Sequence, residues 1–131
     1  MKQLEQLIAK RPIRQAVYEA AMASEGAFTS VELYERVQQK YPRTPRATFF
    51  RALKFLHENG LLRKAALQGG GCVYQRANDP RTILWVCDDC SRVQVLEAAG
   101  VAEALRELAN HRGLKSELMT VEVHSRCGCR N

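Results

Sequence analysis

Two close pairs of cysteines constrain this chain more than any other feature. Cys87 and Cys90 form the first pair, and Cys127 and Cys129 form the second. Each pair brings two thiolates together in one tight turn, and four thiolates complete the tetrahedral ligand set of a closed structural zinc site. A shared ion would join the two ends of residues 87–129, so its role would be to hold the fold. Two disulfides or four unrelated buried thiols are the alternatives.

The expected redox compartment favours zinc over disulfides. The first 11 residues lack the long apolar stretch of a secretory signal, and no segment has the length and hydrophobicity of a membrane span. We therefore expect a soluble cytoplasmic protein, in which thiols stay reduced. A catalytic zinc keeps an open coordination position and usually has histidine ligands, so four cysteines indicate one structural Zn2+ per chain.

Charge is unevenly distributed along the 131 residues. Residues 1–76 contain 13 Lys and Arg against 6 Glu, a net charge of +7, whereas residues 77–131 contain 7 against 8, a net charge of −1. A basic half beside a neutral half is typical of a polyanion-binding domain joined to a second domain. The alternative is a basic surface that contacts only water.

The first half has a helical pattern. Apolar residues at helical spacing predict a short helix around Leu4 and a second helix that begins at Pro12. Thr29 and Glu32 form a capping box in front of a third helix, which ends before Pro42.

The next helix, between Pro45 and Gly60, has two different faces. One face is apolar and is predicted to lie in the core, and the other is cationic with an aromatic residue in its middle. The apolar face consists of Phe49, Leu53 and Leu56, and the cationic face of Arg46, Phe50, Lys54 and His57. The cationic face is the candidate recognition surface for a polyanion.

A hairpin is predicted after this helix, with strands at residues 61–67 and 72–75 and three glycines at its tip. Three helices followed by a glycine-tipped hairpin form the pattern of a winged helix-turn-helix. Its recognition helix enters the major groove while the wing contacts the DNA backbone. We predict that residues 1–77 form such a DNA-binding domain. A helical bundle whose charged face contacts only water is the alternative.

The second half is predicted to be a small α/β domain at residues 81–131, after a turn at Asn78, Asp79 and Pro80. Its predicted elements are strands 82–86 and 92–96, helix 101–111 and strand 118–123. These strands lead into the two cysteine pairs, so zinc would staple this domain. The predicted fold class of the whole chain is therefore α+β.

Several motifs together resemble the ferric uptake regulator family of bacterial metal-responsive repressors, over nearly the whole chain. They are Pro12-Ile13-Arg14, the segment TSVELY at residues 29–34, residues 47–53, Glu58-Asn59-Gly60-Leu61, and the two cysteine pairs. The resemblance implies a homodimer with a winged-helix domain, an α/β dimerisation domain and a structural zinc. It also implies binding to AT-rich palindromic double-stranded DNA.

The family pattern places a Tyr-Arg pair of the recognition helix on DNA. Arg51 matches the arginine, whereas Phe50 replaces the tyrosine and loses its hydroxyl, although a phenyl ring can still pack on a thymine methyl group. The residues expected to contact DNA are Arg14, Arg46, Thr48, Phe50, Arg51 and Lys54.

The regulatory metal site of the family has no counterpart in this sequence. The positions of its ligands are occupied by Thr82, Leu84, Phe28, Gln75, Val95 and Met119, none of which is an adequate metal ligand. Alternative sensors are His111 or His124 with Glu97, Glu117 or Glu122, and the fifth cysteine, Cys72. A lone histidine is more often a surface residue, and Cys72 more often a half-buried strand residue.

We predict a homodimeric regulator, with repression as the implied outcome, that binds DNA without a switchable metal. A zinc-stabilised module that pairs with another regulator is the alternative. An enzyme is not expected, because Cys87 and Cys90 lack the His-x-Glu motif of a zinc deaminase, and neither a Ser/His/Asp set nor a phosphate-binding loop is visible.

Overall fold

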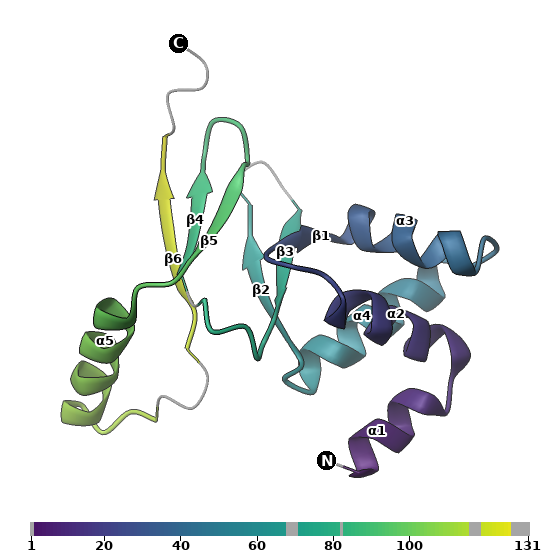
Figure 1. Ribbon diagram of the computed structural model, residues 1–131, viewed down its shortest axis with the longest axis horizontal. Helices are drawn as coiled ribbons and strands as arrows, with labels where there is room; N and C mark the ends of the chain where they lie inside the picture. Colours follow the sequence, from purple (N-terminus) through teal and green to yellow (C-terminus); the bar gives the residue numbers. More distant parts are fainter. Residues whose placement is uncertain (1, 68–70, 82, 116–118, 127–131) are drawn as a thin grey trace.

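The computed structural model describes residues 2–67, 71–81, 83–115 and 119–126. Two groups of elements lie side by side (Figure 1). The first group contains helices α1 (Lys2–Ala9), α2 (Pro12–Met22), α3 (Ser30–Lys40) and α4 (Arg46–Glu58), and strands β1 (Phe28–Thr29), β2 (Leu62–Ala66) and β3 (Cys72–Arg76). The second contains β4 (Ile83–Cys87), β5 (Val93–Leu96), α5 (Ala99–His111) and β6 (Val121–Ser125). This mixture of helices and sheets confirms the predicted α+β class.

The helices of the first group begin where their capping residues predict. The Thr29 hydroxyl accepts a hydrogen bond from the backbone N–H of Glu32 (3.2 Å), and the Glu32 carboxylate lies 3.1 Å from the same hydroxyl. The Thr29 half of the predicted capping box is thus present and satisfies one backbone donor at the start of α3, while the Glu32 side chain binds the Thr29 hydroxyl instead of the Thr29 backbone N–H. Pro12 occupies the first turn of α2, where its missing N–H costs nothing.

The apolar face of α4 forms the centre of the core, as predicted. Phe49, Leu53 and Leu56 are at most 2% exposed, and they pack with Val17 of α2 and Leu33 of α3. Burying a side chain of this size contributes about 1.5–3 kcal/mol. The opposite face of α4 is therefore held at the surface.

The first sheet has the strand order β1-β3-β2. The predicted hairpin is present, with pairs from Leu62 with Arg76 to Ala66 with Cys72. Its tip, Gly69 and Gly70, lies outside the described residues. No sequence pattern predicted the two-residue strand β1.

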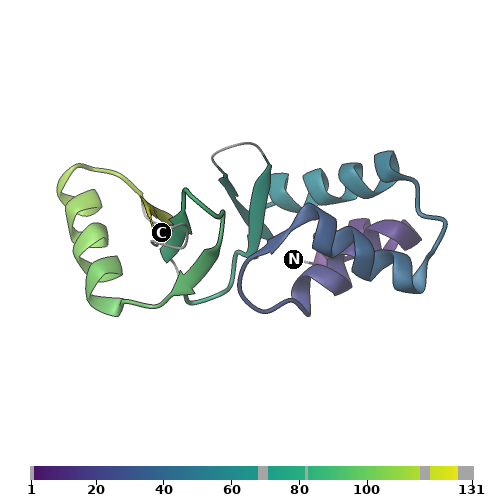
Figure 2. The same ribbon diagram turned by 90° about the horizontal axis from the view of Figure 1, so that it is seen from above.

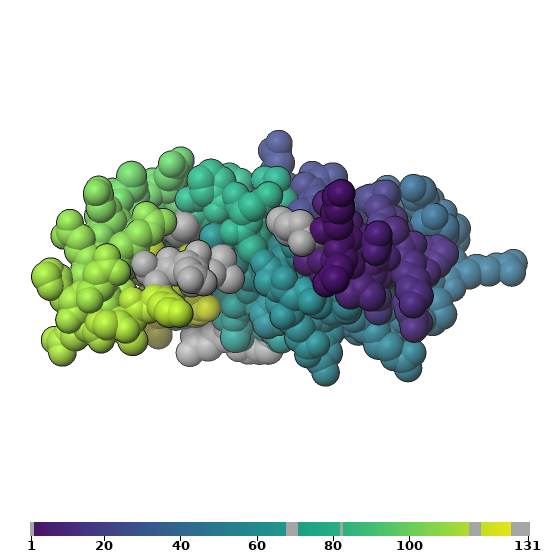
Figure 3. Space-filling model, turned by 90° about the horizontal axis from the view of Figure 1, so that it is seen from below, coloured from purple at the N-terminus to yellow at the C-terminus, as the bar shows by residue number. Residues whose placement is uncertain are grey.

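The second sheet has the strand order β5-β4-β6, with β5 antiparallel and β6 parallel to β4. β6 runs to Ser125 instead of ending at Val123, and α5 begins at Ala99 instead of Val101. Both sheets lie between α5 and the other helices (Figure 2). In the space-filling view α5 forms one end of an elongated molecule (Figure 3). None of the helices in the described ranges has the length and apolar character needed to cross a membrane.

Candidate nucleic-acid interface and metal centre

The outward face of α4 carries the predicted cationic stripe. Arg46, Arg51 and Lys54 are exposed, and Phe50 is 47% exposed although it is a large apolar side chain. Phe50 packs edge-on against Phe49, with ring centroids 5.2 Å apart. The core residue thus holds an aromatic ring at the surface between cations, an arrangement suited to stacking or methyl contacts with a polyanion.

The two ends of this stripe are held by neighbouring side chains. The Arg46 guanidinium lies 5.4 Å from the centre of the Tyr34 ring in a cation–π contact. Lys54 Nζ lies 3.7 Å from a carboxylate oxygen of Glu58, one turn away on the same exposed surface. Such an exposed pair contributes little stability and leaves Lys54 available to another anion.

An open pocket of about 520 Å3 lies between the start of α2 and α4. Its lining includes Arg11, Arg14, Thr48 and Arg51, and no carboxylate. The start of α2 also contributes its helix dipole, which favours anions. The pocket therefore has the charge and the donors to bind a phosphate group.

Arg14 is the most constrained residue of the pocket. Its guanidinium lies 3.9 Å from the centre of the Phe55 ring, and Nη1 donates a hydrogen bond to the Leu7 carbonyl (2.9 Å). Burial, and secondarily repulsion from Arg11, lower the pKa of Arg14. Sequence reasoning missed Arg11. Its location three residues before Arg14, directly ahead of Pro12, was the available signal.

The first cysteine pair flanks a tight turn at the end of β4. Ser91 N donates to the Cys87 carbonyl (2.8 Å), and Cys87 N donates to the Arg92 carbonyl (2.9 Å). Ser91 has a positive φ of 61°, which reverses the chain directly after Cys90. Cys87 is buried and Cys90 is exposed, so one thiol lies at the base of the turn and the other at its surface.

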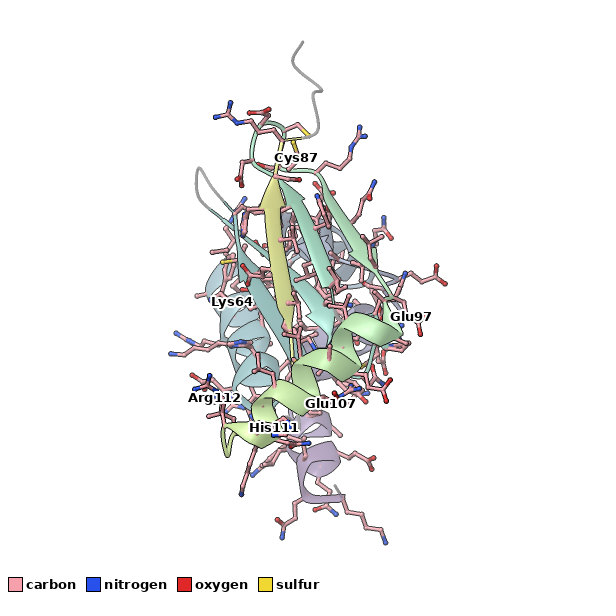
Figure 4. All side chains as sticks on the ribbon, turned by 90° about the vertical axis from the view of Figure 1, so that its left-hand side faces the viewer. Lys64, Cys87, Glu97, Glu107, His111 and Arg112 are labelled. Carbon is pink, nitrogen blue, oxygen red and sulfur yellow. The ribbon has the colours of Figure 1, made fainter. Side chains whose placement is uncertain are left out.

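The turn lies beside the end of β6 (Figure 4). Ser125 is the Cα partner of Cys87, and Asp88 N donates to the Ser125 carbonyl (2.9 Å). Cys127 follows two positions later in the sequence, but Cys127 and Cys129 lie outside the described residues. Among the residues that are described, no three His, Cys, Asp or Glu side chains form a metal site. The Cys87 turn offers soft thiol donors and fits one half of a tetrahedral zinc site.

The candidate sensor His124 is bound by two carboxylates. Its Nδ1 lies 3.0 Å from an oxygen of Asp88 and its Nε2 lies 3.3 Å from an oxygen of Glu122. These hydrogen bonds, first that of Asp88, raise the pKa of His124 above its ordinary value. Because both ring nitrogens already have carboxylate partners, the geometry favours a structural role for His124 between β6 and the turn after β4.

The other candidate sensors are separate from one another. His111 is exposed in the last turn of α5, far from Cys87 (Figure 4). Cys72 is half-buried in β3 opposite Ala66, as expected of a strand residue. Neither lies in a described cluster of metal ligands.

Positions that correspond to regulatory metal ligands in the family pattern form an apolar contact here. Leu84 is 1% exposed and belongs to a cluster with Ala65 and Val73, against which Val95 also packs. This cluster, together with Val93, Ala27 and Leu67, is called the inter-sheet cluster below. Aliphatic side chains supply no metal ligand, so packing occupies the space between the sheets.

A second apolar surface remains open to solvent. An open groove of about 670 Å3 between α5 and β6 is lined by Leu105, Leu108, Leu114 and Val121 among others. Leu108 is 55% exposed and Leu114 is 62% exposed. Trp85 of β4, at 41%, and Leu96 of β5, at 39%, extend the exposed apolar area. An amphipathic helix with so little of its apolar face covered is typical of an association surface.

Comparison with known proteins identifies the family of this chain. The sequence model of the ferric uptake regulator family matches residues 10–124. The zinc uptake regulation protein of Escherichia coli (strain K12) is 25% identical over 134 residues, which cover 97% of this chain and 78% of that protein. Among solved structures, the Helicobacter pylori ferric uptake regulator has a TM-score of 0.79 at 17% identity, over 99% of this chain and 92% of that one. A zinc uptake regulator complexed with zinc and DNA has a TM-score of 0.55 at 24% identity, over 97% and 89%. Because the family match extends over most of its length, the chain belongs to the ferric uptake regulator family.

Proposed function

We propose that this protein is a transcription regulator that binds double-stranded DNA as a homodimer, with residues 1–77 as a winged-helix domain. The observation that carries the proposal is the carboxylate-free arginine pocket beside the exposed face of α4. A family relative is known in complex with zinc and DNA. Occupation of a promoter by such a dimer would repress transcription, which is the outcome that the family resemblance implies.

In the proposed complex α4 enters the major groove. Phe50 packs on thymine methyl groups, and Arg51 lies at the rim of the pocket, where it can reach a base edge or a phosphate. Arg11 and Arg14 hold a backbone phosphate at the start of α2. The hairpin β2–β3 acts as the wing. This division of contacts gives α4 the reading role and α2 the positioning role.

Replacing Arg51 with alanine is expected to weaken operator binding by about 1–3 kcal/mol if Arg51 reads a base. If it contacts mainly phosphate, the slope of affinity against salt concentration should fall by about one. Gel shifts with DNA selected from random sequence, at several salt concentrations, measure both quantities. Arg106→Ala removes the same charge from an exposed position of α5, away from α4 and outside the lining of the groove, and should change neither. Unaltered affinity and unaltered slope in Arg51→Ala would contradict the proposed interface.

The homodimer is proposed to form through residues 81–131. The exposed apolar face of α5 and the neighbouring apolar residues of the second sheet supply a surface that a second copy can cover. A twofold axis there would present two α4 helices to the two half-sites of a palindrome.

We also propose one structural zinc per chain, held by the two cysteine pairs. The turn at Cys87 and Cys90 lies at the end of β4, and the parallel strand β6 ends beside it at Ser125, two positions before Cys127 in the sequence. The ion would supply rigidity to this end of the sheet, not a changeable signal.

DNA affinity is expected to change less than tenfold when iron, manganese or additional zinc is added to zinc-loaded protein. A ligand shifts a conformational equilibrium only by its differential affinity for the two states, and the inter-sheet cluster offers no group to bind it. Titration of labelled operator with and without each metal is the measurement. A tenfold or greater change, about 1.4 kcal/mol of coupling, would reveal a sensor elsewhere. His111 and His124 would then be the first residues to replace.

A further inference from the structure

The first sheet is covered on both faces. Phe28 of β1 and Leu62 of β2 belong to the core formed with the helices. Ala65 of β2 and Val73 of β3 belong instead to the inter-sheet cluster with Leu84 of the second sheet. The two sheets are adjacent in both ribbon views (Figures 1 and 2). A small antiparallel hairpin normally keeps one face in water, so a second sheet packed on that face is a specific contact.

Two polar side chains are buried next to this contact. Arg63 of β2 is 8% exposed and Gln75 of β3 is 0% exposed. They are Cα partners in the hairpin, and strand alternation places them on the same face as Ala65 and Val73. Burial of a guanidinium is costly, and desolvation is the main cause of the lowered pKa of Arg63. Its location therefore requires compensating contacts.

Those contacts are made with the segment that joins the two sheets. Arg63 Nη1 donates to the Asp79 carbonyl (3.2 Å) and lies 3.5 Å from the Arg81 carbonyl. Gln75 Nε2 donates to the same Arg81 carbonyl (2.6 Å). Both strands of the hairpin thus bind the segment at its Asp79 and Arg81 carbonyls, shortly before β4 begins at Ile83. A guanidinium donor gives these carbonyls the hydrogen bonds that solvent would otherwise supply.

The joining segment also contains hydrogen bonds between its own residues. The Asp79 carboxylate accepts hydrogen bonds from Arg81 at N (3.0 Å), Nε (2.9 Å) and Nη2 (2.8 Å). These bonds, first the side-chain bond of Arg81, lower the pKa of Asp79 to about 2. Asp79 is 2% exposed, so its carboxylate is anchored in the interior, while Asn78 and Pro80 on either side of it are exposed.

We propose that Arg63 is a positioning residue that, with Gln75, clamps residues 79–81 and fixes the second sheet against the first. The inter-sheet cluster supplies the apolar contact, and the clamp sets its register by holding both Asp79 and Arg81. The first group of elements, α1 to β3, and the second group, β4 to β6, then move together as one rigid body. The proposal concerns the arrangement of the two sheets and does not depend on whether the protein binds DNA.

Hydrogen exchange of the purified full-length protein tests the clamp without DNA. In Arg63→Met, which keeps the side-chain length but removes the donors, the amides at positions 77, 78, 79 and 81 are expected to exchange about tenfold faster. Amides of α2 and α4 should keep their rates. Arg63→Lys, which keeps a charged donor, should restore part of the protection. Lys64→Met, at the exposed neighbour on the other face, should leave all rates unchanged.

Two results would overturn the proposal. One is unchanged exchange of residues 77–81 in Arg63→Met. The other is a uniform increase that includes α2 and α4, since this reports a global loss of stability and not release of the joining segment. If Arg63→Met does not accumulate as folded protein, Gln75→Leu is the second variant, because it removes the shorter hydrogen bond to the Arg81 carbonyl without changing a buried charge. The same two exchange results in Gln75→Leu would overturn the proposal.

Discussion

Replacement of Cys90 by serine is expected to release the proposed zinc and unfold the second sheet, the largest stability change that a single substitution should cause in this protein. Cys90 is exposed, so the substitution itself removes no core packing. A serine hydroxyl is a poor zinc ligand. A site with only three thiolates binds zinc less tightly and leaves its fourth coordination position without a protein ligand. Because binding free energy at a structural site is folding free energy, loss of metal and loss of structure should occur together.

Elemental analysis and amide exchange measure these two effects in the same sample. Zinc content should fall well below one ion per chain, and β4 to β6 should lose protection while α2 to α4 retain it. Cys72→Ser is the matched control, because Cys72 is a half-buried residue of β3 outside both pairs. It should retain zinc and fold. Full zinc occupancy in Cys90→Ser would exclude the four-cysteine site.

Leu108→Glu is expected to convert the proposed dimer into a monomer and to produce the largest loss of operator affinity. Leu108 is 55% exposed in the single chain, so a carboxylate there should not disturb the fold of the protomer. At a dimer interface the same carboxylate would be buried without a partner, which costs several kcal/mol. A monomer binds one half-site, so the avidity of the paired helices, about 10²- to 10⁴-fold, would be lost.

Light scattering at micromolar concentration and gel shifts with a palindromic operator measure these outcomes. Asn110→Glu places the same charge two residues further along α5, outside the lining of the groove. It should remain dimeric and bind normally. A dimeric Leu108→Glu protein would exclude this face as the interface, and a wild-type monomer with zinc bound would exclude the dimer altogether.

Local patterns predicted most of the helices, because the signals for a helix lie within a few residues of it. The Thr29 cap of α3 and the buried face of α4 are examples, and the structure confirms both. The two-residue strand β1 was not predictable in this way. It exists because Phe28 pairs with Tyr74, far away in the sequence, and two residues carry no periodicity.

The candidate site was harder to predict from the sequence, because its contacts also join residues that are far apart in the chain. Arg14 contacts the ring of Phe55, a pairing that only the packing of α2 on α4 creates. In the sequence, Arg63 looks like an ordinary exposed arginine of a hairpin strand. No neighbouring residue in the sequence indicates that a second sheet covers it. The cysteine pairs were visible because chelation imposes a spacing on the sequence itself.

The parallel pairing of β4 with β6 influences the order in which this protein folds. The elements of the first group, α1 to β3, are all synthesised before β4, whereas β4 can pair with β6 only after β5, α5 and β6 have been made. Pairing over such a separation is slow because the loop must close before any contact rewards it. During that interval one edge of β4, with the apolar residues Leu84 and Val86, stays open to other chains. We expect the interval between synthesis of β4 and of β6 to be the period when this protein is most prone to aggregation.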